Sequence, residues 1–90
     1  MVLKEASVPI VNPLGLHARP AAEFVKTAGR FQAHVTVRKN SMEVNGKSIM
    51  GMMMLAAECG SEILIRAEGE DAEAALVALA ALVAAGFGEM

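Results

Sequence analysis

A helix has to begin within Gly15-Leu16-His17-Ala18-Arg19-Pro20, and this requirement constrains the fold more than any other feature of the sequence. Glycine lets the backbone turn freely. A proline in the first helical turn costs no hydrogen bond, because the N–H that it lacks would have had no partner there. Apolar residues then recur with the spacing of one helical face, at Ala21, Phe24, Val25 and Ala28. The sequence therefore predicts a helix over residues 18–28, with His17 at its N-cap or next to it.

The position of His17 predicts a particular chemistry. Unpaired N–H groups and the positive end of the helix dipole disfavour an imidazolium, so we expect a largely neutral, nucleophilic ring near pH 7. An anion attached to that ring would meet the backbone N–H groups of Ala18 and Arg19 and the Arg19 guanidinium. A histidine or arginine at a helix start is often only structural, but a cation there is slightly unfavourable unless an anion joins it. The stretch therefore predicts a reversible phosphoryl site.

Hydrophobic periodicity divides the rest of the chain into strands and helices. Alternation of apolar and polar residues predicts strands over 4–11, 32–38, 42–44 and 62–67. Pro9 cannot donate a hydrogen bond to a neighbouring strand, so the first strand is expected at a sheet edge. Further helices are expected over 49–57 and 72–85. The order β-α-β-β-α-β-α predicts an α+β fold, in which helices pack on one face of an antiparallel sheet.

The charge distribution limits the class of partner. A chain of 90 residues is expected to form one domain with a modest core, and its net charge of −2 argues against nucleic acid as the main partner. Residues 1–57 hold seven Lys or Arg and three Glu, whereas residues 58–90 hold one Arg and seven acids. An acidic protein surface is therefore expected to dock on the first part of the chain, which contains the helix start.

Cysteine usage and hydropathy predict where the protein works. Cys59 is alone, so no internal disulfide or cysteine metal cluster is expected, and we interpret it as a small core filler. No secretory signal is recognised, and the apolar run from Ala74 to Phe87 is too short to span a bilayer. We therefore expect a soluble cytoplasmic protein with no membrane insertion.

Two stretches resemble one known family. Residues 12–21, Asn-Pro-Leu-Gly-Leu-His-Ala-Arg-Pro-Ala, are similar to the active-site motif of HPr, the histidine-containing phosphocarrier of the bacterial phosphoenolpyruvate:sugar phosphotransferase system. Residues 45–51, Asn-Gly-Lys-Ser-Ile-Met-Gly, resemble the regulatory serine segment of the same family. Two motifs in register are more specific than either alone. Together with the chain length, they extend the resemblance over essentially all of residues 1–90.

The resemblance implies both a fold and an activity. The HPr fold is an open-faced β-sandwich, with four antiparallel strands and three helices on one face. His17 is then expected to accept a phosphoryl group on Nδ1 from phospho-enzyme I and to donate it to enzyme IIA components, with Arg19 stabilising the group. The protein would be a carrier in sugar uptake rather than a classical enzyme, because such transfer needs positioning and charge more than elaborate chemistry. No metal or cofactor is expected.

Ser48 has a structural and a regulatory interpretation. It is a good N-cap for the helix that follows, which is a complete structural reason for a serine. The resemblance adds phosphorylation by an ATP-dependent HPr kinase/phosphorylase, because Ile49-Met50-Gly51 resembles the version found in Gram-positive and related bacteria. A phosphate there would leave the helix folded but would oppose an acidic partner. A transcriptional regulator is a further partner that the resemblance implies.

The helix expected over 49–57 is apolar all round. Its core-facing residues are expected to be Met52, Leu55 and Ala56, and its outer residues Met50, Met53 and Met54. Methionines are often only gap fillers, but a domain this small has to expose part of such a helix, and exposed methionines adapt to several partners. The residues expected to contact partner proteins are Ile49, Met50 and Met53, with a basic rim of Lys26, Arg30 and Lys47. A carrier of this kind is expected to be a monomer.

Two other functions stay open from the sequence. One is a regulatory paralogue, like that of the nitrogen-related branch of the system, which signals through phosphorylation and contributes little to sugar flux. The presence of His17 with Arg19 favours the carrier, because a regulator acting through Ser48 alone could dispense with the histidine. The other is a small enzyme or ligand-binding domain of ferredoxin-like layout, for which the expected glycine-rich phosphate loop or acid pair is missing.

Overall fold

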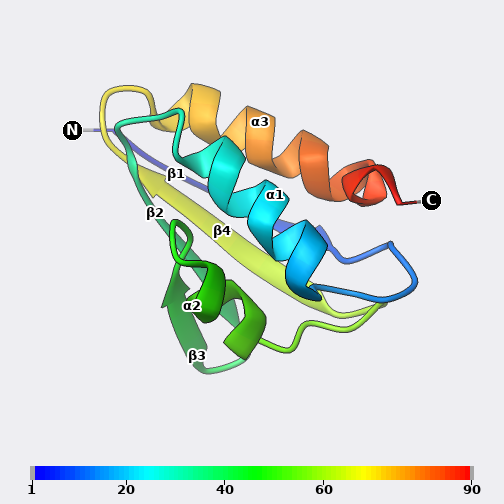
Figure 1. The fold of residues 1–90 in the computed structure, drawn as a ribbon. Coiled ribbons are helices and arrows are strands. Elements are labelled where there is room, and N and C mark those ends of the chain that lie inside the picture. Colours follow the sequence, from blue (N-terminus) through cyan, green and yellow to red (C-terminus); the bar gives the residue numbers. More distant parts are fainter. Residues whose placement is uncertain (1, 90) are drawn as a thin grey trace.

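The computed structural model describes residues 2–89, and Figure 1 shows how they are arranged. In chain order the elements are β1 (Leu3–Pro9), α1 (Ala18–Ala28), β2 (His34–Lys39), β3 (Met42–Asn45), α2 (Ile49–Met54), β4 (Glu62–Glu68), α3 (Ala72–Ala84) and a 3-10 turn, η1 (Gly86–Gly88). The predicted order β-α-β-β-α-β-α is confirmed, and α1 has the predicted bounds at both ends. No helix in this part of the chain is long and apolar enough to cross a membrane.

The four strands form one antiparallel sheet in the order β1-β4-β2-β3. β1 lies at an edge of this sheet, as the proline at its end predicts, with Pro9 opposite Glu62 of β4. Figure 1 shows α1 and α3 side by side across one face, with α2 closer to β3. The fold predicted for the HPr family, with three helices on one face of the sheet, is confirmed.

The core lies between the sheet and the helices. The buried residues of β2 and β4 alternate along each strand and are Val35, Val37, Ile63, Ile65 and Ala67. The register sets Val37 beside Ile65, so that one apolar surface runs across both strands. The helices cover this surface with Ala21, Phe24, Ala28, Met52, Ala75, Leu79 and Val83. The core therefore holds α1 in place, and the start of α1 carries His17.

The second helix is shorter than the sequence predicts. α2 ends at Met54 instead of continuing to residue 57, and Ala56 adopts a left-handed backbone (φ +50°) that an α-helix does not accommodate. The prediction that Ala56 faces the core is wrong, because Ala56 is exposed and Ala57 is buried instead. Met52 and Leu55 are buried as predicted. The left-handed turn brings the Ala57 carbonyl to the loop before α1, where it accepts a hydrogen bond from the Leu16 N–H at 2.9 Å.

Cys59 is not the core filler that its residue type indicates. It is exposed in the loop that joins α2 to β4. Its Sγ lies 3.7 Å from the carbonyl oxygen of Val11, at the surface of the protein. Leu55 and Ala57 of the same loop are buried instead.

Past α3 the chain turns back toward the start of α1. Gly86, Phe87 and Gly88 all have positive φ values, of 64°, 57° and 76°. The Phe87 side chain is buried and anchors the turn, and the Glu89 N–H donates a hydrogen bond to the Gly86 carbonyl at 3.0 Å. This turn, which was not predicted from the sequence, brings Glu89 beside His17.

Candidate functional site

The loop before α1 is held in one conformation by backbone contacts. The Gly15 N–H donates to the Asn12 carbonyl at 3.1 Å, and the Leu16 N–H donates to the Ala57 carbonyl at 2.9 Å. Gly15 has a φ of +67°, and a Cβ at this position would lie 2.5 Å from the Ala57 oxygen. Glycine is therefore required here both for its backbone conformation and for the close approach of the two chain segments.

His17 is the N-cap residue of α1, as the sequence predicts. Its backbone is extended (φ −76°, ψ −172°), and its carbonyl accepts a hydrogen bond from the Ala21 N–H at 3.0 Å. The side chain makes no capping hydrogen bond and is 37% exposed, so the ring is accessible from solvent. The backbone N–H groups of Ala18 and Arg19 have no hydrogen-bond acceptor among residues 2–89. These two donors remain available to an anion near the ring.

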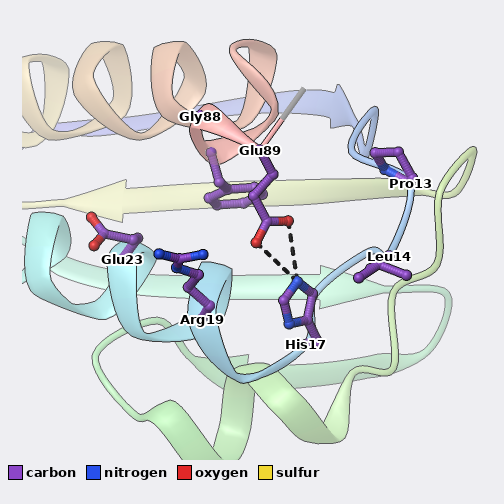
Figure 2. A pocket seen from close by; sticks show the side chains of 8 residues that line it. Pro13, Leu14, His17, Arg19, Glu23, Gly88 and Glu89 are labelled. Atoms are coloured by element: carbon purple, nitrogen blue, oxygen red, sulfur yellow. Dashed lines mark hydrogen bonds and ion pairs between the residues drawn. The ribbon is translucent and has the colours of Figure 1, made fainter.

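The carboxylate of Glu89 faces the imidazole ring of His17. Its two oxygens lie 3.1 Å and 3.0 Å from His17 Nε2, and Figure 2 shows the second ring nitrogen on the far side of the ring from this carboxylate. Asn12 Nδ2 donates hydrogen bonds to Glu89 Oε1 at 2.9 Å and to the Gly15 carbonyl at 2.8 Å. Asn12 is fully buried, so this amide fixes the carboxylate relative to the loop.

Glu89 is negatively charged at neutral pH. Its partial burial raises the pKa of the carboxyl, but the hydrogen bonds from Asn12 and His17 outweigh this effect, together with the attraction of Arg19 and of His17 when the ring is protonated. The net result is a pKa for Glu89 below its ordinary value. The ring of His17 therefore lies between the positive helix start, which the sequence predicts, and a negative charge that only the structure shows.

Arg19 lines the same open cleft as His17. The residues around this cleft are Pro13, Leu14, His17, Arg19, Glu23, Phe87, Gly88 and Glu89. Arg19 lies in the first turn of α1, its side chain is exposed, and Figure 2 shows its guanidinium in the cleft between Glu23 and Glu89. No residue in the range 2–89 forms an ion pair with this guanidinium. An unpaired cation at a helix start slightly destabilises the helix, but it can bind an incoming anion.

Comparison with known proteins identifies the family. The family model described as "PTS HPr component phosphorylation site" matches residues 4–85. The chain belongs to the HPr family. The phosphocarrier protein HPr of Neisseria meningitidis serogroup A is 49% identical over 83 residues, which cover 92% of this chain and 93% of that protein.

Two other members of the HPr family are also similar. A crystal structure of HPr-C-His from Thermoanaerobacter tengcongensis has a TM-score of 0.93 at 47% identity, covering 97% of this chain and 98% of that one. The HPr-like protein Crh of Bacillus subtilis is 52% identical over 69 residues, covering 77% of this chain and 81% of Crh. As a phosphocarrier of the HPr family, the chain is a carrier and not a catalytic enzyme. The alternative of a small enzyme of ferredoxin-like layout is therefore wrong.

The second HPr-like motif lies at the start of α2. Ser48 is the N-cap of this helix, as predicted, and its Oγ accepts a hydrogen bond from the Gly51 N–H at 3.0 Å. Its side chain is half-buried. The hydroxyl therefore has a structural role at this position, and the capping bond uses the oxygen as an acceptor without using its proton.

The outer side of α2 exposes a group of large apolar side chains. They are Ile49, Met50, Met53 and Met54, of which Met50 is 73% exposed. α2 packs against α1 and β3, so this group lies on the same side of the molecule as the helix that begins at His17. Lys26 is exposed in the last turn of α1, whereas the Lys47 ammonium donates a hydrogen bond to the Phe31 carbonyl at 2.7 Å and is half-buried.

Sequence reasoning assigned no role to the carboxylate that contacts the His17 ring or to the amide that holds this carboxylate in place. Asn12 was included in the motif of residues 12–21 without a role of its own, and Glu89 was not singled out. The available signal was an isolated acid that follows Gly-Phe-Gly at the end of the long apolar run. Its contact with His17 spans 72 positions of the chain, so only the tertiary structure shows it.

Proposed function

We propose that this HPr-family protein carries a phosphoryl group on Nδ1 of His17, between phospho-enzyme I and enzyme IIA components that serve sugar uptake. The observation that supports this most is the His17 ring itself. It is open to solvent at the start of α1, its Nε2 is bonded to Glu89, and its Nδ1 is the remaining nitrogen. A transient bond from phosphorus to Nδ1 needs this combination of exposure and a free lone pair.

The surroundings of His17 favour a dianionic group there. The backbone N–H groups of Ala18 and Arg19 lie at the positive end of α1, and the Arg19 guanidinium lines the same cleft. Donors fixed in position before the reaction stabilise charge without reorganisation, which is the main requirement of phosphoryl transfer. The proposed roles are acceptor for His17, backbone phosphate binding for Ala18 and Arg19, and charge stabilisation for the Arg19 side chain.

The exposed side of α2 is the proposed docking surface for enzyme I and the enzyme IIA components. Its proposed contact residues are Ile49, Met50 and Met53, flanked by the basic residues Lys26 and Lys47. Flexible apolar side chains fit several partners in turn, and the basic flank raises the rate of association with acidic surfaces. We further propose that the protein acts as a cytoplasmic monomer, because a carrier that docks on several partners in turn suits a monomer.

Ser48 is a proposed site of regulation by an HPr kinase/phosphorylase, with a transcriptional regulator as a further partner of the phosphorylated form. A phosphate on its Oγ would add a charge of about −2 next to the apolar residues of α2. Enzyme I would then be repelled from the docking surface. Incubation with ATP and cytosol of the source organism, followed by phosphopeptide mapping, tests this role, and an unmodified Ser48 would argue against it.

Phosphorylation in vitro tests the carrier function. The protein is incubated with phosphoenolpyruvate and enzyme I, and the product is examined for an acid-labile phosphate by ³¹P NMR and intact mass. We expect one phosphoryl group per chain on wild type and none on His17→Ala. The matched control is His34→Ala, since His34 is the other histidine and lies exposed in β2. Uptake by His17→Ala, or none by wild type, would refute the proposal.

A regulatory paralogue is the second candidate, because the HPr-like protein Crh is among the similar proteins. Such a regulator would be modified at Ser48 and would transfer little phosphate through His17. The intact arrangement of His17, Arg19 and Glu89 favours the carrier. The ratio of the two modifications under identical conditions separates the two functions.

A further inference from the structure

Glu89 is held in place by the turn that precedes it and by its contacts in the cleft. Phe87 is buried, and the left-handed turn from Gly86 to Gly88 directs the following residue into the cleft. A left-handed phenylalanine is strained, so its burial and the contacts of Glu89 have to offset an unfavourable backbone. This turn places a carboxylate against His17, and among residues 2–89 the side chains that bond this carboxylate are those of His17 and Asn12.

The contact determines which ring nitrogen carries the proton. An ionised carboxylate can only accept hydrogen bonds, so at 3.0–3.1 Å from Glu89 the Nε2 atom must be the donor. In a neutral imidazole the proton on Nε2 leaves the lone pair on Nδ1. Glu89 thus selects the tautomer in which Nδ1 of His17 is the nucleophile.

Asn12 makes the selection geometrically specific. Its Nδ2 has two acceptors, the Gly15 carbonyl in the loop and Glu89 Oε1. Because Asn12 is fully buried, it cannot exchange these acceptors for water, and the carboxylate is aligned with the loop that carries His17. Glu89 Oε1 accepts from both Asn12 and His17, at 2.9 Å and 3.1 Å.

We propose that Glu89 is a positioning residue for phosphoryl transfer, which keeps the His17 proton on Nε2 and balances the positive charge of the ring while Nδ1 is phosphorylated. The inference rests on the proposed function. It assigns to the segment after α3 a direct part in the reaction, in addition to its part in packing.

The charge balance follows from the transfer step. The Nδ1 lone pair forms a bond to phosphorus as the donor's bond to phosphorus breaks and the donor recovers that electron pair. The Nε2 proton stays in place, so the ring becomes positive, and the Glu89 carboxylate faces this charge. On delivery the N–P bond breaks, its electron pair returns to Nδ1, and the ring is neutral again. Glu89 therefore stabilises the positive charge of the ring while His17 holds the phosphoryl group. After delivery Glu89 keeps the proton on Nε2.

Two substitutions separate the hydrogen bond from the charge. In Glu89→Gln the amide oxygen can replace Oε1 and accept from both Asn12 and His17, while the negative charge is lost. In Glu89→Ala the charge and both hydrogen bonds are lost. The matched control is Glu73→Gln, the same change of charge at an exposed position in the first turn of α3, at the opposite end of that helix.

The first measurement is the tautomer of His17, from the ring ¹⁵N chemical shifts at alkaline pH in the protein without phosphate. We expect the Nε2–H form to predominate in wild type, Glu73→Gln and Glu89→Gln, and a mixture of tautomers in Glu89→Ala. The second measurement is the rate of phosphoryl transfer from phospho-enzyme I. We expect transfer about tenfold slower in Glu89→Gln, with a further loss in Glu89→Ala, because charge-assisted hydrogen bonds are among the strong ones.

The outcomes are distinguishable. If Glu89→Ala has the wild-type tautomer and transfers at the wild-type rate, the role of Glu89 is refuted. The same conclusion holds if the thermal midpoint falls while both readouts stay unchanged, because that result describes a residue with a structural role only. If wild type accepts no phosphoryl group, the proposed function fails together with the role of Glu89 in it. The tautomer readout needs no phosphate, so this failure is recognised separately.

Discussion

The backbone N–H of Leu16 donates a hydrogen bond of 2.9 Å to the carbonyl oxygen of Ala57. This bond joins the loop before α1 to the segment that follows α2. The proposed phosphoryl site and the proposed docking helix are therefore tied together by the backbone, and α1 and α2 also pack against each other. A disturbance of either segment is expected to reach the other.

Substitution of Gly15 tests this junction. In Gly15→Ala the new Cβ would lie 2.5 Å from the Ala57 oxygen at a residue with a φ of +67°. We compare it with Gly60→Ala, where φ is +94° but no atom lies within 4 Å, so that only backbone strain acts. We expect Gly60→Ala to lower the free energy of unfolding by about 1–2 kcal/mol, and Gly15→Ala to lower it by about 1–3 kcal/mol more. If urea denaturation shows the same decrease in the free energy of unfolding for both variants, the close approach of Gly15 to Ala57 does not contribute to the effect.

Removal of the Arg19 side chain is expected to affect transfer and not stability. In Arg19→Ala the rate of phosphoryl transfer from phospho-enzyme I should fall by about tenfold to a hundredfold, because one donor to the developing charge is lost. The free energy of unfolding should stay within about 0.5 kcal/mol of wild type, because Arg19 is exposed and has no ion-pair partner among residues 2–89. Arg38→Ala, which removes an exposed arginine of β2, is the control. An unchanged transfer rate would remove Arg19 from the site.

Charges on the outer side of α2 should weaken docking. The double variant Met50→Lys and Met53→Lys places two ammonium groups where exposed apolar side chains now lie, with the core residue Met52 unchanged. We expect the dissociation constant for enzyme I to rise about tenfold or more. Apolar contacts are lost, and the new ammonium groups would have to lose their water on binding. The control is Val77→Lys, also exposed but on α3. If isothermal titration finds both variants equal to wild type, α2 is not the docking surface.

The lowered pKa of Glu89 predicts a pH dependence of stability. A carboxyl whose pKa is lower in the folded state stabilises it fully above the unfolded pKa, which is about 4.3 for glutamate. That stabilisation is lost as the pH falls through the lower folded pKa. The difference in stability between wild type and Glu89→Gln should be constant near neutral pH and should shrink in acid. The variant removes the contribution of Glu89 alone, although the pKa of Glu58 is also lowered, by hydrogen bonding of its carboxyl to its own backbone and by Lys39. If the difference in stability between wild type and Glu89→Gln stays constant into acid, the pKa of Glu89 is not lowered by folding.

Local patterns predicted most of the fold. Periodicity placed α1 and the alternating buried residues of β2 and β4, and Pro9 placed β1 at the edge of the sheet. These features depend on a residue's immediate neighbours and on burial of one face, which a sequence displays directly. The end of α2 was not predictable in this way. All its residues are apolar, so the pattern continues past the point where the left-handed Ala56 ends the helix.

The candidate site also combines features that local sequence predicts with features that depend on tertiary packing. The position of His17 at the start of α1, with Arg19 in the first turn, follows from Gly15 and Pro20, because local backbone geometry decides where a helix begins. The carboxylate against His17 does not follow from any local pattern. It needs the turn at Gly86-Phe87-Gly88 and the buried amide of Asn12, which meet only after the sheet and α3 have packed.

The sequence by itself determined the family, the order of the elements and the residue proposed to carry the phosphoryl group, since these depend on motifs and on short-range periodicity. The resemblance implied Nδ1 as the acceptor, but only the tertiary structure gave a physical reason, which is that Glu89 occupies Nε2. The deciding contact, between His17 and Glu89, joins residues from opposite ends of the chain, and its energy depends on distance and burial that packing alone establishes.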